Sequence, residues 1–394
     1  MKYPKGPVKP GKSLTYIWIF TALLFVLAGG LYLDYDRNRD SRTSAEFAGQ
    51  SGEEAQSEGG LPNWVEVHGE MPPGQYFTLN DEKGEPVQWT SIIVHQGDEF
   101  ITANNRRFEV TTVDYTNLTA ACRFIGVEEM AYYTAWDEAP VASLFGKEDD
   151  ATKIGVYMTH NDESYVPTDG TESIDGRGGI MEVGDTFGAT LEQTGHQVTV
   201  SDNHHDPHDA NAYHRSRKTA VQLLKENPDV LFDVHRDGIE DPGYYETEIN
   251  GEKVTGIRLV VGKQNPHMET NLTFAKEIKA YMDKHYPGLI KDIYMGKGNY
   301  NQDLGPRVML LEVGTHTNSR EEAEAGAQVF AKGVGEYLQA SIGSGVGAAA
   351  KTQGKETTAV ERKSGSSAAI IAGVAVVLGV VFILVSRGPS RGRS

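Results

Sequence analysis

The sequence is poor in cysteine and in positive charge. Its 394 residues include one cysteine, Cys122, so neither a disulfide framework nor a thiolate zinc cluster can form within the chain. Any metal must therefore be held by histidine and carboxylate side chains. Lysine and arginine number 37 against 55 acidic residues, and the net charge of −18 argues against a nucleic-acid-binding protein. The chain also lacks internal repeats and a phosphate-binding glycine loop.

Apolar runs long enough to span a membrane occur near the two ends, at residues 14–33 and 368–386. A cleaved secretory signal has an apolar core of only ~7–15 residues, so an uncleaved anchor fits the first run better. Lysines precede the first run and arginines follow the second. By the positive-inside rule, both tails (1–13 and 387–394) are predicted to be cytoplasmic, and the region between the spans lies outside the cell membrane.

Between these runs the composition changes three times. A polar stretch rich in Ser, Glu and Gly predicts a flexible stalk at 34–60. Residues 61–150 contain runs of strand composition and are predicted to be a small β-rich region. Residues 151–340 are predicted to form the catalytic α/β domain. A Gly/Ala/Ser/Lys-rich linker at 341–367 leads to the second span.

The pattern within 151–340 alternates strand and helix, which predicts an α/β fold with a mostly parallel sheet flanked by helices. Apolar residues at helical spacing mark four helices, and Ser319 with Glu322 forms a capping box for the last one. The first predicted strand begins at Lys153, and the later ones cover 196–201, 230–237, 257–262 and 307–314. The predicted helices cover 180–191, 209–226, 272–282 and 319–338.

Two of the predicted strands deliver a histidine at their carboxyl ends, His160 and His235, and a third delivers Glu312. Ligands collect at that edge of open α/β sheets, so these groups are candidates for one shared site. A catalytic zinc takes three His, Asp or Glu ligands, and a nearby carboxylate moves the proton of the attacking water. Two residues compete as third ligand: Glu163 in the loop after His160, and Glu182 at the start of the next helix.

Further polar residues near these strands are candidates for substrate binding or for orienting the ligands. They include Asn161, one histidine of the string at 204–208 (His205), and the carboxylates that flank His235, Asp237 among them. Arg215 and Arg217 open a predicted helix and could pair with a substrate carboxylate. For each of these residues a structural hydrogen bond or a solvated surface position is a competing interpretation.

Ordered motifs from about Gly155 to Leu338 make the chain resemble the stage II sporulation protein P family. The members of this family are membrane-anchored hydrolases of the cell wall, and they are similar to zinc-dependent N-acetylmuramoyl-L-alanine amidases. The motifs are 159–165 (THNDESY), 205–217, 232–237 (FDVHRD), 261–267 (VGKQNPH), 300–304 (YNQDL) and 311–314 (LEVG). The second apolar run is a departure from the family pattern.

The resemblance implies roles for four residues. It assigns the zinc ligands to His160, Glu182 and His235 and the general acid/base to Glu312, with Glu163 as the alternative ligand or a substrate contact. It implies cleavage of the amide between muramic acid and L-alanine, with cross-link cleavage as a second activity, during engulfment of the forespore. It also implies a complex with stage II sporulation proteins D and M. The alternatives are a zinc endopeptidase of cross-links only, and an inactive wall-binding scaffold.

Overall fold

The computed structural model describes residues 71, 74–132, 151–209 and 211–344. The chain divides into two compact units, 1–60 and 61–394, and all described residues belong to the second. The predicted tails, membrane spans and stalk, and nearly all of the predicted linker, lie outside the described residues. Within the described ranges, no helix combines the length and apolar character needed to cross a membrane.

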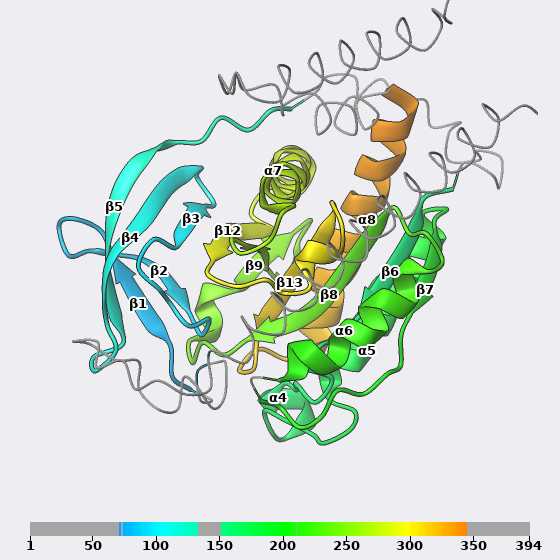
Figure 1. Ribbon diagram of the computed structural model, residues 1–394, viewed down its shortest axis with the longest axis horizontal. Helices are drawn as coiled ribbons and strands as arrows, with labels where there is room; N and C mark the ends of the chain where they lie inside the picture. Colours follow the sequence, from blue (N-terminus) through cyan, green and yellow to red (C-terminus); the bar gives the residue numbers. More distant parts are fainter. Residues whose placement is uncertain (1–70, 72–73, 133–150, 210, 345–394) are drawn as a thin grey trace, which may run out of the picture. The chain divides into compact units, whose positions relative to one another are not determined.

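An eleven-stranded sheet forms the centre of the described unit (Figure 1). Its strand order is β2-β1-β5-β4-β3-β12-β11-β13-β8-β6-β7, and a separate hairpin pairs β9 with β10. The strands are β1 (Phe77–Asn80), β2 (Pro86–Thr90), β3 (Glu99–Thr102), β4 (Arg106–Asp114), β5 (Thr119–Val127), β6 (Lys153–Tyr157), β7 (Gln197–Val200), β8 (Val230–Asp237), β9 (Glu246–Ile249), β10 (Glu252–Thr255), β11 (Ile257–Gly262), β12 (Ile290–Gly296) and β13 (Val308–Thr315).

Helices cover both faces of this sheet. One face packs against the apolar sides of α5, α7 and α8 in one large core, in which Phe187, Phe274 and Phe330 are buried. On the other face, α6 covers β6 and β8 through a smaller cluster that includes Tyr157 and Leu231. The helices are α4 (Val166–Asp169), α5 (Gly179–Gln193), α6 (Ala212–Leu224), α7 (Met268–His285) and α8 (Arg320–Ser344), with short 3-10 turns η3 (Pro242–Tyr244) and η4 (Gln302–Leu304).

The prediction of an α/β fold is confirmed, but the sheet is mixed where a mostly parallel one was expected. β6, β7, β8 and β13 run parallel, as do β11 and β12, whereas β11 pairs antiparallel with β13. The β-rich strands add more antiparallel pairs, because short turns join β3 to β4 and β4 to β5, and a parallel pair would need a long crossover.

The predicted β-rich strands join the same sheet as the α/β strands. β3 pairs antiparallel with β12, with Glu99–Thr102 opposite Asp292–Met295. A second apolar core, including Phe77, Phe100 and Phe108, fills the interior of β1–β5. The β-rich region is therefore continuous with the sheet that carries the two histidines.

Local patterns placed most helices and strands correctly. The predicted inner face of α5 is fully buried at Ile180, Val183, Phe187 and Leu191, and the Ser319 hydroxyl accepts a hydrogen bond from the Glu322 amide at 3.2 Å. β12 and the β9–β10 hairpin were not predicted. In β12 the charged Asp292 interrupts the apolar run, and its burial depends on a partner from another strand.

Candidate metal and catalytic site

The two predicted histidines lie together at the carboxyl ends of β6 and β8. These strands are parallel neighbours, with Tyr157 opposite Asp233, so the chain after β6 meets the end of β8. The centroids of the His160 and His235 rings are 5.1 Å apart, and each residue is 2% exposed. The sheet thus brings two imidazoles from distant parts of the sequence into one buried site.

Asp233 connects both histidine-bearing strands. Its Oδ1 lies 3.0 Å from His235 Nε2, and it also accepts hydrogen bonds from the Thr159 amide (2.8 Å) and hydroxyl (2.6 Å). Thr159 directly precedes His160. A carboxylate behind an imidazole is the arrangement that orients a metal-ligating histidine. Asp233 therefore lies at the Nε2 edge of the His235 ring, and Nδ1 is the other ring nitrogen.

Glu163 is the carboxylate that faces His235 Nδ1. Its Oε2 lies 3.8 Å from that nitrogen, and the side chain is 2% exposed. The Arg236 amide donates to the same oxygen at 3.0 Å and fixes its position. Zinc binds nitrogen and oxygen at ~2.0–2.2 Å, so two atoms up to about 4.3 Å apart can share one ion. The His235 and Glu163 atoms satisfy that condition.

Glu182 occupies a different environment. It lies in the first turn of α5, its side chain is 41% exposed, and its carboxylate accepts a hydrogen bond from Arg177 Nε at 3.3 Å. The buried face of α5 is formed by the neighbouring positions Met181 and Val183. Of the two candidates for the third ligand, Glu163 is the one that lies near His235, whereas Glu182 is half-exposed and pairs with Arg177.

Glu312 lies beside His235 on the adjacent strand β13. The two residues are in register across the parallel pair β8–β13, and residues in register point to the same face of a sheet. Glu312 is 6% exposed. A carboxylate in this position is one strand spacing, ~4.8 Å, from the histidine backbone. Glu312 therefore lies at the same edge of the sheet as His235.

A further histidine, His208, and a further carboxylate, Asp162, also lie beside His160. Possible ligand atoms of His160, Asp162 and His208 all lie within 4.8 Å of one another, the single such group among the described residues. The His160 and His208 rings stack with centroids 4.0 Å apart. Burial opposes ionisation of Asp162, but the hydrogen bonds from His208 and Ser173 lower its pKa to about 2. This trio could hold a metal ion.

His208 was missed because the sequence could not choose within the string at 204–208. The residue selected there, His205, is structural: its ring nitrogens bond to the Met158 carbonyl (2.9 Å) and the Thr219 hydroxyl (2.8 Å). Burial lowers the pKa of His205 accordingly.

Asn161 also supports this loop. Its side chain accepts from the His205 amide at 2.5 Å and donates to the Gly176 carbonyl (2.7 Å) and to Asp206 (3.1 Å). Asn161 therefore positions the loop that carries His208.

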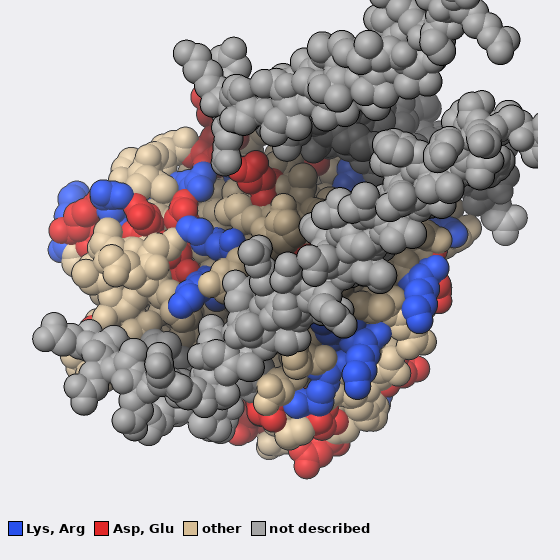
Figure 2. All heavy atoms as spheres, in the orientation of Figure 1, with Lys and Arg blue, Asp and Glu red and all other residues tan. Residues whose placement is uncertain are grey.

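The two arginines of α6 are paired with protein groups. Arg215 binds the carbonyls of His205 and Pro207 and the Asp209 carboxylate, while Arg217 makes a bidentate pair with Asp303 at 2.8 and 2.6 Å. Basic side chains gather over α6 on the face shown in Figure 2. Both arginines brace loops, and a role in binding a substrate carboxylate stays a prediction.

Asp237 pairs with groups other than the His235 ring. It forms a buried ion pair with Arg258 and accepts hydrogen bonds from the Ser91 amide (3.0 Å) and hydroxyl (2.5 Å) and from Tyr245 (2.9 Å). Both members of the ion pair are fully buried. Of the two aspartates that flank His235, Asp233 holds the ring, and Asp237 links the end of β8 to the β-rich region.

The electrostatics of His235 agree with a cation site. Burial disfavours a charged imidazole, but the carboxylates of Asp233 and Glu163 outweigh it and raise the pKa of His235 well above 6.5. The same negative surroundings stabilise any cation placed between His235 and Glu163. Metal binding here competes with a proton.

Comparison with known proteins identifies the family. The sequence model of the stage II sporulation protein P (SpoIIP) family matches residues 95–335, more than half of the 394-residue chain. The chain belongs to the SpoIIP family. The matched range begins before β3 and so includes strands of the β-rich region as well as both histidines, Glu163 and Glu312.

One similar relative is the stage II sporulation protein P of Bacillus subtilis (strain 168), which is 33% identical over 206 residues. The alignment covers 46% of this chain and 51% of the relative, so the chain spans about half the length of the curated relative it matches.

Two solved structures were also found to be similar. The N-acetylmuramoyl-L-alanine amidase AmiC2 of Nostoc punctiforme is 15% identical with a TM-score of 0.32, and 48% of this chain covers 97% of that one. The CwlD amidase from Clostridioides difficile, solved in complex with the GerS lipoprotein, is 15% identical with a TM-score of 0.34, and 48% of this chain covers 98% of it.

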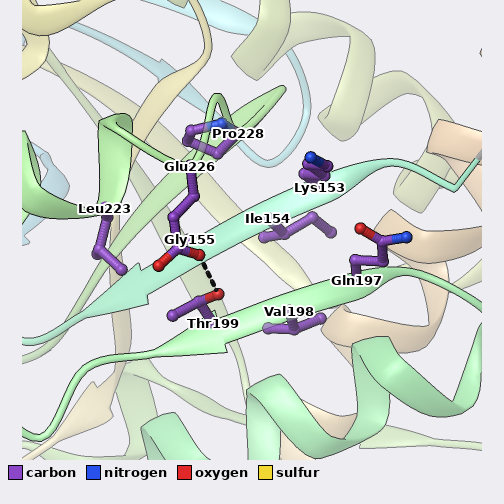
Figure 3. A pocket seen from close by; sticks show the side chains of 9 residues that line it. All are labelled: Lys153, Ile154, Gly155, Gln197, Val198, Thr199, Leu223, Glu226 and Pro228. Carbon is purple, nitrogen blue, oxygen red and sulfur yellow. Dashed lines mark hydrogen bonds between the residues drawn. The ribbon is translucent and has the colours of Figure 1, made fainter.

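A pocket lies away from this site, at the amino-terminal ends of β6 and β7 (Figure 3). It is lined by Lys153–Gly155, Gln197–Thr199, and residues at and just after the end of α6. Among the latter, Glu226 accepts a hydrogen bond from Thr199 at 2.8 Å. β6 runs from this pocket toward His160, so the two lie at opposite ends of the strand.

Proposed function

We propose that this SpoIIP-family protein is a zinc-dependent hydrolase of peptidoglycan, which cleaves the amide between muramic acid and L-alanine. The carrying observation is the buried group of His160, His235 and Glu163, with Asp233 behind His235 and Glu312 in register beside it. The family supports wall hydrolysis in sporulation, with cross-link cleavage as a second activity.

The donor set fits zinc. Two imidazoles and one carboxylate are the ligands of many catalytic zinc sites, and an outer carboxylate that holds one imidazole is their usual companion. When bound, zinc supplies Lewis-acid activation of a water molecule and of the scissile carbonyl. We assign His160, Glu163 and His235 to hold it. Asp162 and His208 are the competing ligand pair, because they share His160.

The residues of the chain then divide the work. Asp233 keeps the His235 ring in one tautomer and orientation. Arg236 fixes Glu163 through its amide. The Glu312 carboxylate accepts a proton from the attacking water and returns it to the leaving amide nitrogen, a role that requires a carboxylate close to the reacting atoms.

The location and the partners of the protein are also proposals. The apolar runs at 14–33 and 368–386 support an anchored enzyme whose catalytic region lies outside the cell membrane. Family membership supports a complex with stage II sporulation proteins D and M. Co-purification of the full-length chain from membranes with each candidate partner tests this. If neither partner co-purifies, the proposed complex is refuted.

The deciding experiment is digestion of purified peptidoglycan by the full-length chain, followed by mass spectrometry of the fragments. An amidase releases stem peptides with a free L-alanine amino group, whereas an endopeptidase releases uncrosslinked stems still attached to muramic acid. Zinc content is measured in parallel. Binding to the wall without any cleavage, with the candidate partners added, would favour the scaffold alternative and refute the proposal.

A further inference from the structure

Four charged or ionisable residues form a row across four adjacent strands of the sheet. Asp292 on β12 is in register with Arg258 on β11, Arg258 with Glu312 on β13, and Glu312 with His235 on β8. Residues in register share a face, so all four side chains start from the face opposite the large apolar core. The row leads from the proposed metal ligand through the proposed general base to a buried ion pair.

Arg258 is the fully buried centre of this row. Its Nε donates to Asp292 at 2.8 Å, and Nη1 donates to Asp237, the residue two positions after His235. Nη2 donates to the Tyr244 hydroxyl at 3.2 Å. The guanidinium is planar and rigid, so fixing its edges fixes the strands on either side of it.

The remaining partners of Arg258 come from the β-rich region. Nη1 donates to the Thr90 hydroxyl at 2.9 Å, and Nη2 donates to the Trp89 carbonyl at 2.6 Å. The next residue, Ser91, donates its amide and its hydroxyl to Asp237. Residues 89–91 therefore hold both members of the ion pair that borders Glu312 and His235.

These contacts are not required to attach the β-rich region. β3 already pairs with β12 along Glu99–Thr102, and Lys263 pairs with Glu99 at 2.7 Å. Burying one guanidinium with two carboxylates costs desolvation that apolar residues would avoid. A satisfied buried network instead holds its members in a single arrangement.

We infer that residues 89–91 of the β-rich region are positioning residues of the active site, acting through Arg258 and Asp237 on Glu312 and His235. This gives the β-rich region a role in catalysis although it contributes no ligand. The inference rests on the proposed function for what Glu312 and His235 do.

The test compares Thr90→Val with Thr90→Ser in the full-length chain. Valine keeps the shape but removes the acceptor of Arg258, and leaves a buried donor unsatisfied. Serine keeps the hydroxyl and loses a methyl group. The readouts are kcat and KM on soluble glycan–peptide fragments, zinc affinity by competition with a chromophoric chelator, and the thermal midpoint.

For Thr90→Val we expect kcat and zinc affinity each to fall about tenfold, the lower end of the effects seen for residues behind metal ligands. KM stays unchanged, because Thr90 is fully buried and cannot touch substrate. Thr90→Ser retains kcat and zinc affinity although its thermal midpoint falls. The matched control Glu99→Gln weakens a different contact of the β-rich region and leaves kcat and zinc affinity unchanged.

Wild-type values for Thr90→Val, equal losses in Thr90→Ser, or a similar loss in Glu99→Gln would each overturn the inference. Zinc affinity separates it from the proposed function. If the wild type binds zinc but cleaves no fragment, the proposed function fails and the two Thr90 variants still decide the inference by affinity. If the wild type cleaves fragments without zinc, the kcat values of the two Thr90 variants decide the inference. A wild type that does neither counts against both.

Discussion

The two sides of His160 offer similar ligands in different settings. On one side lie Glu163 and His235, each 2% exposed, with Asp233 holding the imidazole. On the other lie Asp162 and His208, and the His208 side chain is 28% exposed on a loop. Both pairs have the chemistry to bind a metal, but only the first contains a residue, His235, that is in register with Glu312. A catalytic metal site needs a rigid donor set and a proton acceptor together, which favours the side of His235.

The largest effect is expected from Glu312→Gln. Glutamine keeps the size of the side chain but cannot accept the proton, so kcat should fall about 10²–10⁴-fold while bound zinc remains. Fragment release from purified peptidoglycan and zinc content check this. Loss of zinc together with activity would mean that Glu312 is a ligand.

Glu163→Gln and Asp162→Asn form a matched pair that compares the two sides of His160 directly. We expect Glu163→Gln to weaken zinc binding by more than about 100-fold, since removal of a ligand should exceed the effect of removing a residue behind one. Asp162→Asn should weaken zinc binding far less than Glu163→Gln, because Asp162 is not a ligand in this arrangement. The reverse result would move the metal to the His208 side.

Asp233→Asn tests why the His235 side is the more rigid one. Asparagine keeps the size of the side chain next to the ring but loses its charge, so zinc affinity should drop about 10–100-fold with His235 still in place. Chelator competition measures the drop. Unchanged affinity would show that Asp233 serves only to join β6 and β8.

Zinc binding should release protons, because the pKa of His235 is raised well above 6.5 by Asp233 and Glu163. Below that raised pKa the zinc-free imidazole carries a proton that the metal must displace, so affinity rises with pH and levels off once His235 is neutral. Calorimetry in buffers of different ionisation enthalpy measures the released protons. Binding without proton release would argue against His235 as a ligand.

The smallest effect is expected for Glu182→Gln. The pair with Arg177 is 41% exposed at both residues, so its loss should change the free energy of unfolding by less than about 0.5 kcal/mol. Zinc affinity and kcat should match wild type. A loss of zinc would restore Glu182 as the third ligand and make Glu163 a substrate contact.

Local sequence pattern was sufficient for most elements of the α/β region. Apolar runs predicted the strands β6, β8, β11 and β13. The helical spacing of the apolar residues in α5 predicted its buried face, which consists of Ile180, Val183, Phe187 and Leu191. The strand β12 escaped detection because the partner that allows Asp292 to be buried, Arg258, is 34 residues away. The mixed strand directions of the sheet were not predicted for the same reason, because strand pairing depends on residues far apart in the sequence.

The sequence by itself determined that His160, His235 and Glu312 follow or end apolar strands, because period and polarity are local properties of the chain. Only the tertiary structure decided which of the two candidate carboxylates lies near His235. Glu182 on α5 is half-exposed and pairs with Arg177, whereas Glu163 lies 3.8 Å from His235 and is held by the Arg236 amide of β8. The roles of Asp233, Arg258 and the β-rich region were likewise decided there, because they depend on register across strands that no local pattern encodes.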